Sequence, residues 1–145
     1  MPSQTLGIVK PDAVGTGKTG AILAHLERAG FSVRACRLVR LTRPQAEAFY
    51  AVHRGRPFYD DLVAFMTSGP CLPMALERAG ADAVPAMRET IGATDPAEAG
   101  EGTIRRLYAE SKGRNAIHAS DSDENAAREI AFFFGEGELA GLWGA

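Results

Sequence analysis

The sequence predicts an α+β fold in which a small β-sheet is covered by helices on one face. Two observations carry this prediction. Short apolar segments bounded by Gly, Pro or Asp have the length of strands, and longer segments with apolar residues three to four apart have the period of helices. Their order along the chain, β-α-β-α-α-β-α-β-α, has few strands and many helices, which favours one sheet with helices packed against it.

The chain begins with a strand and a helix. Residues 5–10 predict a short apolar strand, which the turn signal Pro11-Asp12 ends. Thr19 is placed to cap the helix that follows. Gly30 occupies the position after the last helical residue, where glycine favours termination.

The next segments alternate in the same way. Residues 31–41 predict a long strand, because they are apolar with β-branched valines, and the interrupting arginines imply partial exposure. Thr42 and Gln45 have the spacing of a capping box and predict a helix start. A loop and a second short helix follow and end at Gly69, and residues 71–77 predict another strand.

Two prolines and one long loop constrain the second half of the chain. Pro73 cannot donate to a β-ladder, so it should stand where no hydrogen bond is needed. Pro85 fits a helix over residues 81–92 only if it lies in the first turn. Residues 93–115 predict a long irregular stretch, and loops of that length in compact domains are typically functional.

A last strand over residues 116–120 and a last helix over residues 123–134 complete the pattern. We therefore expect residues 1–145 to form a single domain. The expected topology is a split βαβ arrangement, that is, a ferredoxin-like βαββαβ fold with a four-stranded antiparallel sheet covered by helices.

Composition excludes several classes of function. The net charge of −2 over 145 residues predicts no general affinity for nucleic acid. The chain has no signal-peptide pattern and no apolar run long enough to cross a bilayer, so we expect a soluble protein without a membrane partner. Cys36 and Cys71 lie far apart, which fits reduced thiols in a cytoplasmic protein.

Residues 14–20 resemble half of a P-loop. Gly17, Lys18 and Thr19 match its second half, but Asp12 stands where the first glycine is required. A carboxylate there would repel phosphate. A P-loop nucleotide switch is therefore a disfavoured hypothesis.

The segment 115–125 is the strongest candidate for chemistry. His118 ends an apolar strand just before a helix, and three acidic residues load the first turn of that helix. The partial positive charge of the helix terminus disfavours an imidazolium, which leaves a neutral ring nitrogen able to act as a nucleophile. The alternative is a structural histidine capped by Ser120 or Asp121.

Donors of the kind that bind polyphosphates occur elsewhere in the chain. Lys10, Arg88 and Arg105 supply charge, and Thr94 and Asn115 supply a hydroxyl and an amide. Spacing does not show that they converge. Taken singly, each cation fits a solvated surface role better than a phosphate site.

Four segments in order resemble the nucleoside diphosphate kinase family. "NAIHASDS" at residues 115–122 is similar to the family's active-site signature, and residues 8–14 are similar to its first strand and lysine. Residues 50–70 resemble its helical hairpin, and residues 92–105 resemble its long loop. The similarity covers nearly the whole chain.

This resemblance implies an enzyme that moves the γ-phosphate of a nucleoside triphosphate to a nucleoside diphosphate through a phosphohistidine on His118, in a ping-pong cycle with broad base specificity. It implies that Glu129 orients the imidazole with support from Ser120, and that Phe58 stacks on the base. Mg²⁺ would enter bound to the nucleotide, without dedicated protein ligands. The resemblance also implies a homo-oligomer, a hexamer or a tetramer. The implied nucleotide site comprises Lys10, which also counts as catalytic, and Tyr50, Phe58, Arg88, Thr94, Arg105 and Asn115.

Some residues depart from the family's pattern. Arg106 and Leu107 replace a small residue and an aspartate, and Lys112 replaces an apolar residue on the second side of the base site. A third hypothesis is an inactive ferredoxin-like binding module, which the complete set of phosphate-site residues argues against. Trp143, near the chain terminus, fits either an assembly contact or a loose tail.

Overall fold

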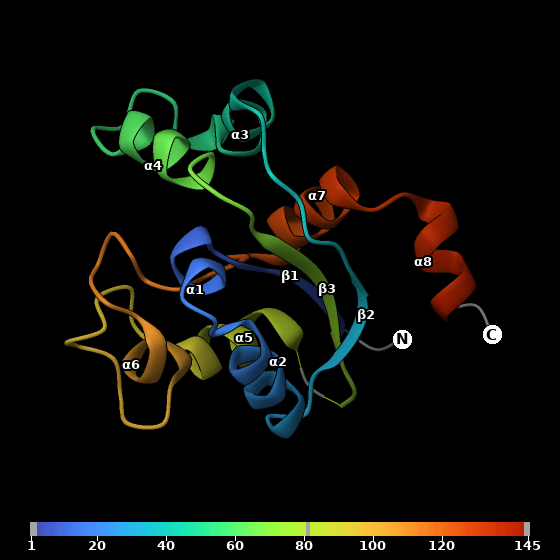
Figure 1. Ribbon diagram of the computed structural model, residues 1–145. Helices are drawn as coiled ribbons and strands as arrows, with labels where there is room; N and C mark the ends of the chain where they lie inside the picture. Colours follow the sequence, from blue (N-terminus) through green and yellow to red (C-terminus); the bar gives the residue numbers. More distant parts are fainter. Residues whose placement is uncertain (1–2, 81, 144–145) are drawn as a thin grey trace.

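The computed structural model describes residues 3–80 and 82–143, the last four of these by their backbone only. The side chain of Trp143 therefore lies outside the described part. Figure 1 shows a central sheet between two layers of helices. The strands are β1 (Ser3–Val9), β2 (Ser32–Cys36), β3 (Leu72–Arg78) and β4 (Ile117–Ala119), and the helices are α1 (Pro11–Gly15), α2 (Thr19–Arg28), α3 (Arg43–Phe49), the 3₁₀ turn η1 (Ala51–His53), α4 (Tyr59–Met66), α5 (Ala83–Ile91), α6 (Ile104–Tyr108), α7 (Asp123–Phe133) and α8 (Glu136–Trp143).

The predicted sheet is confirmed. The described strands form one four-stranded sheet in the order β2-β3-β1-β4, and β1 pairs antiparallel with both β3 and β4. The pair β2–β3 is also antiparallel. This is the ferredoxin-like βαββαβ topology, with α3 and α4 inserted between β2 and β3.

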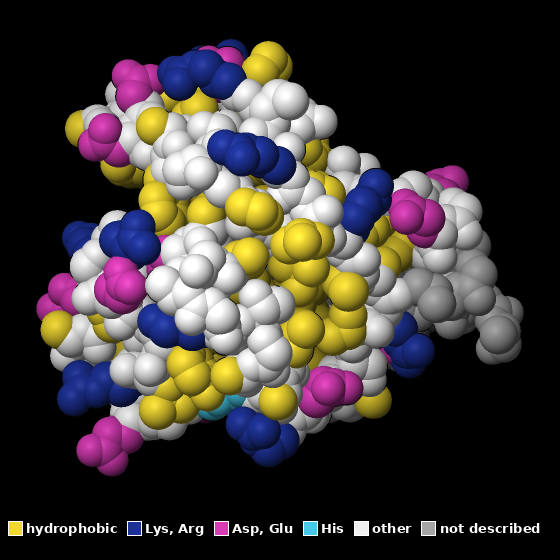
Figure 2. Space-filling view, viewed as in Figure 1, with side chains coloured by type: hydrophobic (Ala, Val, Ile, Leu, Met, Phe, Trp, Pro, Cys, Tyr) yellow, Lys and Arg dark blue, Asp and Glu magenta, His cyan; other side chains and the backbone are white. Residues whose placement is uncertain are grey.

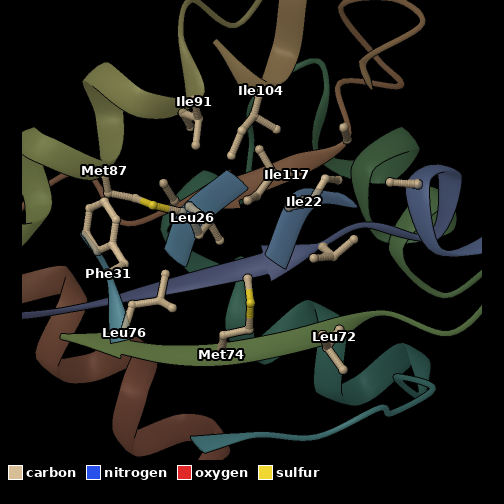
Figure 3. Packing of buried hydrophobic residues seen from close by; sticks show 14 of the residues in the cluster. Ile22, Leu26, Phe31, Leu72, Met74, Leu76, Met87, Ile91, Ile104 and Ile117 are labelled. Atoms are coloured by element: carbon tan, nitrogen blue, oxygen red, sulfur yellow. The ribbon is translucent and has the colours of Figure 1, made fainter. Parts of the chain in front are cut away.

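The prediction that helices cover only one face of the sheet is wrong. On one face, Met74 and Leu76 of β3 pack with side chains of α2, α5 and α6 (Figure 3). On the other, Leu6 and Ile8 of β1 pack with side chains of α3, α4 and α7. Both faces of the central strands are apolar, so both must be removed from water.

Several element boundaries differ from the prediction. The strand expected over residues 31–41 ends at Cys36, and beyond it only Val39 bridges to Cys71. Pro73 accounts for the gap: its carbonyl accepts from Arg37, so the side of the residue that lacks an N–H faces β2. Its pairing with Ile8 on the β1 side is kept.

The predicted helix features are confirmed in part. The capping box of Thr42 and Gln45 is present, and Pro85 lies in the first turn of α5. The prediction that Thr19 caps α2 is wrong, because Lys18 is the N-cap residue and makes no side-chain cap bond. The irregular stretch 93–115 contains α6, which the Thr103 side chain caps, and α1 and α8 were not predicted.

Candidate active site

The pairing of β1 with β4 brings the predicted residues together. Ile8 of β1 lies opposite His118 of β4, and Lys10 follows directly at the end of β1. The backbone N–H of Lys10 donates to the carbonyl of Ala116 at 2.9 Å. Two segments more than a hundred residues apart in the chain therefore deliver a lysine and a histidine to one place.

His118 is held by a carboxylate from α7. Its Nε2 lies 2.7 Å from Oε1 of Glu129, and the Ser120 hydroxyl donates to the same oxygen at 2.9 Å. The Ser122 side chain caps α7 at the end of the β4 connection, and Glu129 lies about two turns further along the same helix. The helix thus turns Glu129 back toward the strand that carries His118.

The charge state of His118 follows mainly from burial. Its side chain is 18% exposed, and burial lowers the pKa of the imidazole, whereas the hydrogen bond that the ring donates to Glu129 raises it. The charges of Lys10 and Arg105 lower that pKa further. The ring is therefore neutral near pH 7, as predicted, and the main cause is desolvation. With Nε2 donating to Glu129, Nδ1 keeps the lone pair.

Two aromatic rings pack against the imidazole of His118. Phe49 and Tyr50 both meet the His118 ring edge-on, with ring centroids 5.5 and 6.1 Å away. Sequence reasoning missed Phe49, although its helical spacing from the buried Ala46 marks it as a core position. Burial raises the pKa of Tyr50, and its hydroxyl makes no hydrogen bond to any described residue.

The predicted phosphate-binding cations converge beside His118. The Lys10 ammonium donates to Asn115 Oδ1 at 2.9 Å, and Arg88 donates to the carbonyl of Ala119 at 3.3 Å. Burial, together with the charge of Arg105, lowers the pKa of Lys10 to about 8. Three cations so close together repel one another, so a polyanion between them is strongly favoured.

Most of the predicted site residues line one cavity of about 940 Å³, which is ample for a nucleotide. In Figure 2 the outline of the molecule is notched between the part that carries α4 and the part that carries α6. Arg105 and Ser120 do not line the cavity. Arg105 lies behind it, bonded to the carbonyls of Gly92 and Ile117. The lining residues that were predicted are Lys10, Tyr50, Phe58, Arg88, Thr94, Asn115, His118 and Glu129.

The mouth of the cavity offers a flat apolar platform. Phe58 is 49% exposed and lies edge-on to the ring of His53 at 5.3 Å. Leu62 and Phe65 of α4 extend this wall, and Lys112 faces the same cavity. Sequence reasoning did not place His53, Leu62, Phe65 or Arg114 at the site. The only signal for Arg114 was its position directly before Asn115.

Lys18, which suggested a P-loop, is engaged elsewhere. Its ammonium donates to the carbonyl of Tyr108 at 3.0 Å, which ties the start of α2 to the end of α6. Lys18 is not among the residues that line the cavity. Its contact is structural.

No group of three or more His, Cys, Asp or Glu side chains able to hold a metal ion occurs in residues 3–80 and 82–143. Within the same ranges, every helix is too short or too polar to span a bilayer.

Known proteins resemble this chain closely. A family model described as nucleoside diphosphate kinase matches residues 3–139. A nucleoside diphosphate kinase of Chlorobium luteolum is 58% identical over 136 residues, which cover 94% of this chain and 96% of that protein. One from Sorangium cellulosum is 56% identical over 137 residues, with 94% of each chain covered.

Solved structures agree. The Aquifex aeolicus nucleoside diphosphate kinase superposes with a TM-score of 0.91 at 46% identity, covering 95% of this chain and 99% of that one. A halophilic nucleoside diphosphate kinase from Halobacterium salinarum, solved in complex with CDP, gives a TM-score of 0.89 at 40% identity over 99% and 98% of the two chains. This chain therefore belongs to the nucleoside diphosphate kinase family, whose members are phosphotransferases that move the γ-phosphate of a nucleoside triphosphate to a nucleoside diphosphate.

Proposed function

We propose that His118 carries the phosphoryl group between the two nucleotides in a ping-pong cycle. Nδ1 of the neutral ring attacks the γ-phosphorus, the bond from that phosphorus to the β–γ bridging oxygen breaks, and the nucleoside diphosphate leaves with the bonding electrons. A terminal phosphate oxygen of a second nucleoside diphosphate then attacks the phosphohistidine and regenerates the ring. The observation that supports this assignment is the 2.7 Å contact between His118 Nε2 and Glu129, which leaves Nδ1 as the nucleophilic atom.

Glu129 fixes the ring and stabilises the positive charge that develops on it during attack. Ser120 holds the carboxylate of Glu129 through its hydroxyl. Phe49 and Tyr50 limit rotation of the imidazole by packing against it. Tyr50 acts in this way because its hydroxyl is buried and does not reach into the cavity mouth.

The cations neutralise the phosphates. Lys10 and Arg88 reach the phosphate chain directly, and Arg105 contributes its charge from behind the wall of the cavity. Asn115 and Thr94 complete the site; the Asn115 amide donates to the Thr94 carbonyl at 3.4 Å, which links the loop to the cavity floor.

The base stacks on Phe58 at the cavity mouth. An aromatic platform contacts the face of any base and reads no base edge, so the enzyme accepts purine and pyrimidine nucleotides alike. The half-exposed ring of Phe58 supports this role.

Mg²⁺ would enter bound to the nucleotide phosphates, where it would neutralise part of their charge. The residues of this chain supply the remaining positive charge and the nucleophile.

We further propose that the chain is one cytoplasmic catalytic domain that assembles as a homo-oligomer. Both cysteines are free thiols, which fits a reducing compartment. Figure 2 shows hydrophobic side chains gathered over β2 and β3 on one face, and Leu38, just beyond β2, is 61% exposed. Sedimentation measurements distinguish a hexamer from a tetramer.

Incubation with γ-labelled ATP and Mg²⁺, without an acceptor, tests the proposed function. We expect acid-labile label on the protein, and its quantitative loss when a nucleoside diphosphate is added. Protein that takes up no label, or label that an acceptor does not remove, would contradict the ping-pong cycle.

The lowered pKa of Lys10 predicts an alkaline limb in the pH profile. The ammonium is charged below its pKa of about 8 and loses its charge above it, so kcat/KM should fall as the pH rises through about 8. The Lys10→Ala variant should have low activity and lack this limb. Lys18→Ala is the matched control and should keep both the limb and the rate. An unchanged limb in Lys10→Ala would assign the titration to another group.

A further inference from the structure

Ala116 has an unusual backbone conformation. Among the described residues it is the only non-glycine with a positive φ, at 72°. The Ile117 N–H donates to the Asn115 carbonyl at 2.9 Å, so residues 115–117 form a γ-turn centred on Ala116. Turns of this kind with a positive central φ are rare and strained for a residue with a side chain. Such strain persists only where the surroundings impose it.

The surroundings that hold Ala116 come from the segment after β1. The Ala116 N–H donates to Asp12 Oδ2 at 3.0 Å, and its carbonyl accepts from the Lys10 N–H at 2.9 Å. Ala116 is fully buried and Asp12 is 4% exposed, so water does not compete for either bond. Both backbone polar groups of the strained residue are therefore bound by residues 10–12.

The Asp12 carboxylate has one hydrogen-bond partner among the described residues. Its hydrogen bond to Ala116 is the only one it makes to the described residues, and its Oδ1 is buried without a partner there. An unpaired buried carboxylate oxygen is unfavourable. A fold selected for stability alone would satisfy or remove it, which points to a functional reason for the carboxylate.

The turn at Ala116 positions groups that the proposed function uses. Asn115, directly before it, accepts from the Lys10 ammonium at 2.9 Å. His118, two residues after it, enters β4 with its ring toward Glu129. A change at Ala116 therefore displaces the phosphate-binding amide and the nucleophile together.

We propose that Asp12 is a positioning residue for phosphoryl transfer, whose carboxylate holds the strained turn at Ala116 and thereby sets the relative positions of Lys10, Asn115 and His118. The inference rests on the proposed function. Asp12 touches neither the ring of His118 nor the cavity, so it acts only through the backbone of Ala116 and through its charge near Lys10.

Glycine at position 116 provides the decisive test, because it adopts positive φ without steric strain and needs no clamp. The rate of His118 phosphorylation by γ-labelled ATP is measured for Asp12→Ala with and without Ala116→Gly. We expect Asp12→Ala to slow phosphorylation by about 10- to 100-fold, as for other residues that orient an active-site group. The double variant with Ala116→Gly should then be phosphorylated at least about tenfold faster than Asp12→Ala alone. Asp82→Ala, which removes an exposed carboxylate that makes no cap bond, is the matched control.

A second variant separates the hydrogen bond from the charge. Asp12→Asn keeps an oxygen for the Ala116 N–H but removes the negative charge that raises the pKa of Lys10, while Arg105 and His118 still face that lysine. Below the alkaline limb its rate should stay within about threefold of wild type, and the limb itself should move to lower pH. Asp12→Asn also carries the test if Asp12→Ala is unfolded at the assay temperature, which thermal melting of each variant determines.

Any of three results overturns the inference. Asp12→Ala is phosphorylated as fast as wild type, or folded Asp12→Ala is slow and Ala116→Gly does not restore its rate. The third is that Asp12→Asn is phosphorylated as slowly as Asp12→Ala. These differ from failure of the proposed function, in which the wild-type chain itself takes up no acid-labile label. If the wild type takes up acid-labile label and Asp12→Ala is phosphorylated at the same rate, the positioning role is wrong but the proposed function stands.

Discussion

Replacing His118 with glutamine should abolish labelling by γ-labelled ATP and lower kcat by at least about 10⁴-fold, the scale of loss when a covalent nucleophile is removed. Glutamine is close in size and can still hydrogen-bond Glu129, so the fold and the cavity should remain. What disappears is the ring nitrogen at Nδ1, for which the amide has no nucleophilic equivalent. The binding of nucleotide, followed by fluorescence or calorimetry, should change little.

His25→Gln is the matched control for this variant. His25 lies on α2 and packs its ring edge-on to Tyr108 at 6.5 Å, and it does not line the cavity. We expect His25→Gln to be labelled like wild type. Acid-labile label that persists on His118→Gln would assign the nucleophile to another residue.

Replacing Glu129 with alanine should slow formation of the phosphohistidine by about 10²-fold or more. The ring loses its 2.7 Å partner, and the buried Ser120 hydroxyl loses the acceptor that it shares with His118. The imidazole can then rotate, and the positive charge that forms on it during attack is no longer balanced. Rapid-quench measurement of label at the first turnover isolates this step from product release.

The pH profile of the Glu129 variant gives an independent check. Glu129 raises the pKa of His118 through its hydrogen bond and charge, against the larger lowering by burial. Without it the pKa falls further, the ring stays neutral to more acidic pH, and the acid limb of the phosphorylation rate should move to lower pH. Glu124→Gln, an exposed carboxylate in the first turn of the same helix, should leave both rate and limb as they are. An acid limb in Glu129→Ala at the wild-type pH would contradict the orienting role.

Local sequence signals predicted much of the fold. The capping box at Thr42, the glycine after α2 and the apolar runs of β1 and β3 depend on neighbours a few residues away, and these were read correctly. The short helices α1 and α6 were missed, because a helix of five residues has too few turns to show a period. The second helical layer was missed because an apolar run does not say how many faces are buried.

The residues of the candidate active site were also predicted only in part. The family resemblance, which covers nearly the whole chain, indicated the site residues, and eight of the predicted residues line a single cavity. It did not indicate Phe49, Leu62 or Phe65, which come from α3 and α4 and reach the site only because those helices fold over one face of the sheet.

The sequence by itself determined most of the strands and helices of this protein, its family and the residue types available for phosphoryl transfer, because these depend on short-range pattern and composition. The tertiary structure alone decided the pairings of Lys10 with Asn115 and of Asp12 with Ala116, and it shows the contact of His118 with Glu129 that the family resemblance implies. Each joins residues from different elements, and only the register of β1 on β4 and the direction of α7 bring them within hydrogen-bonding distance. Asp12 illustrates the difference. In the sequence it interrupts the P-loop pattern, and in the structure its carboxylate accepts a hydrogen bond from Ala116, two residues before His118.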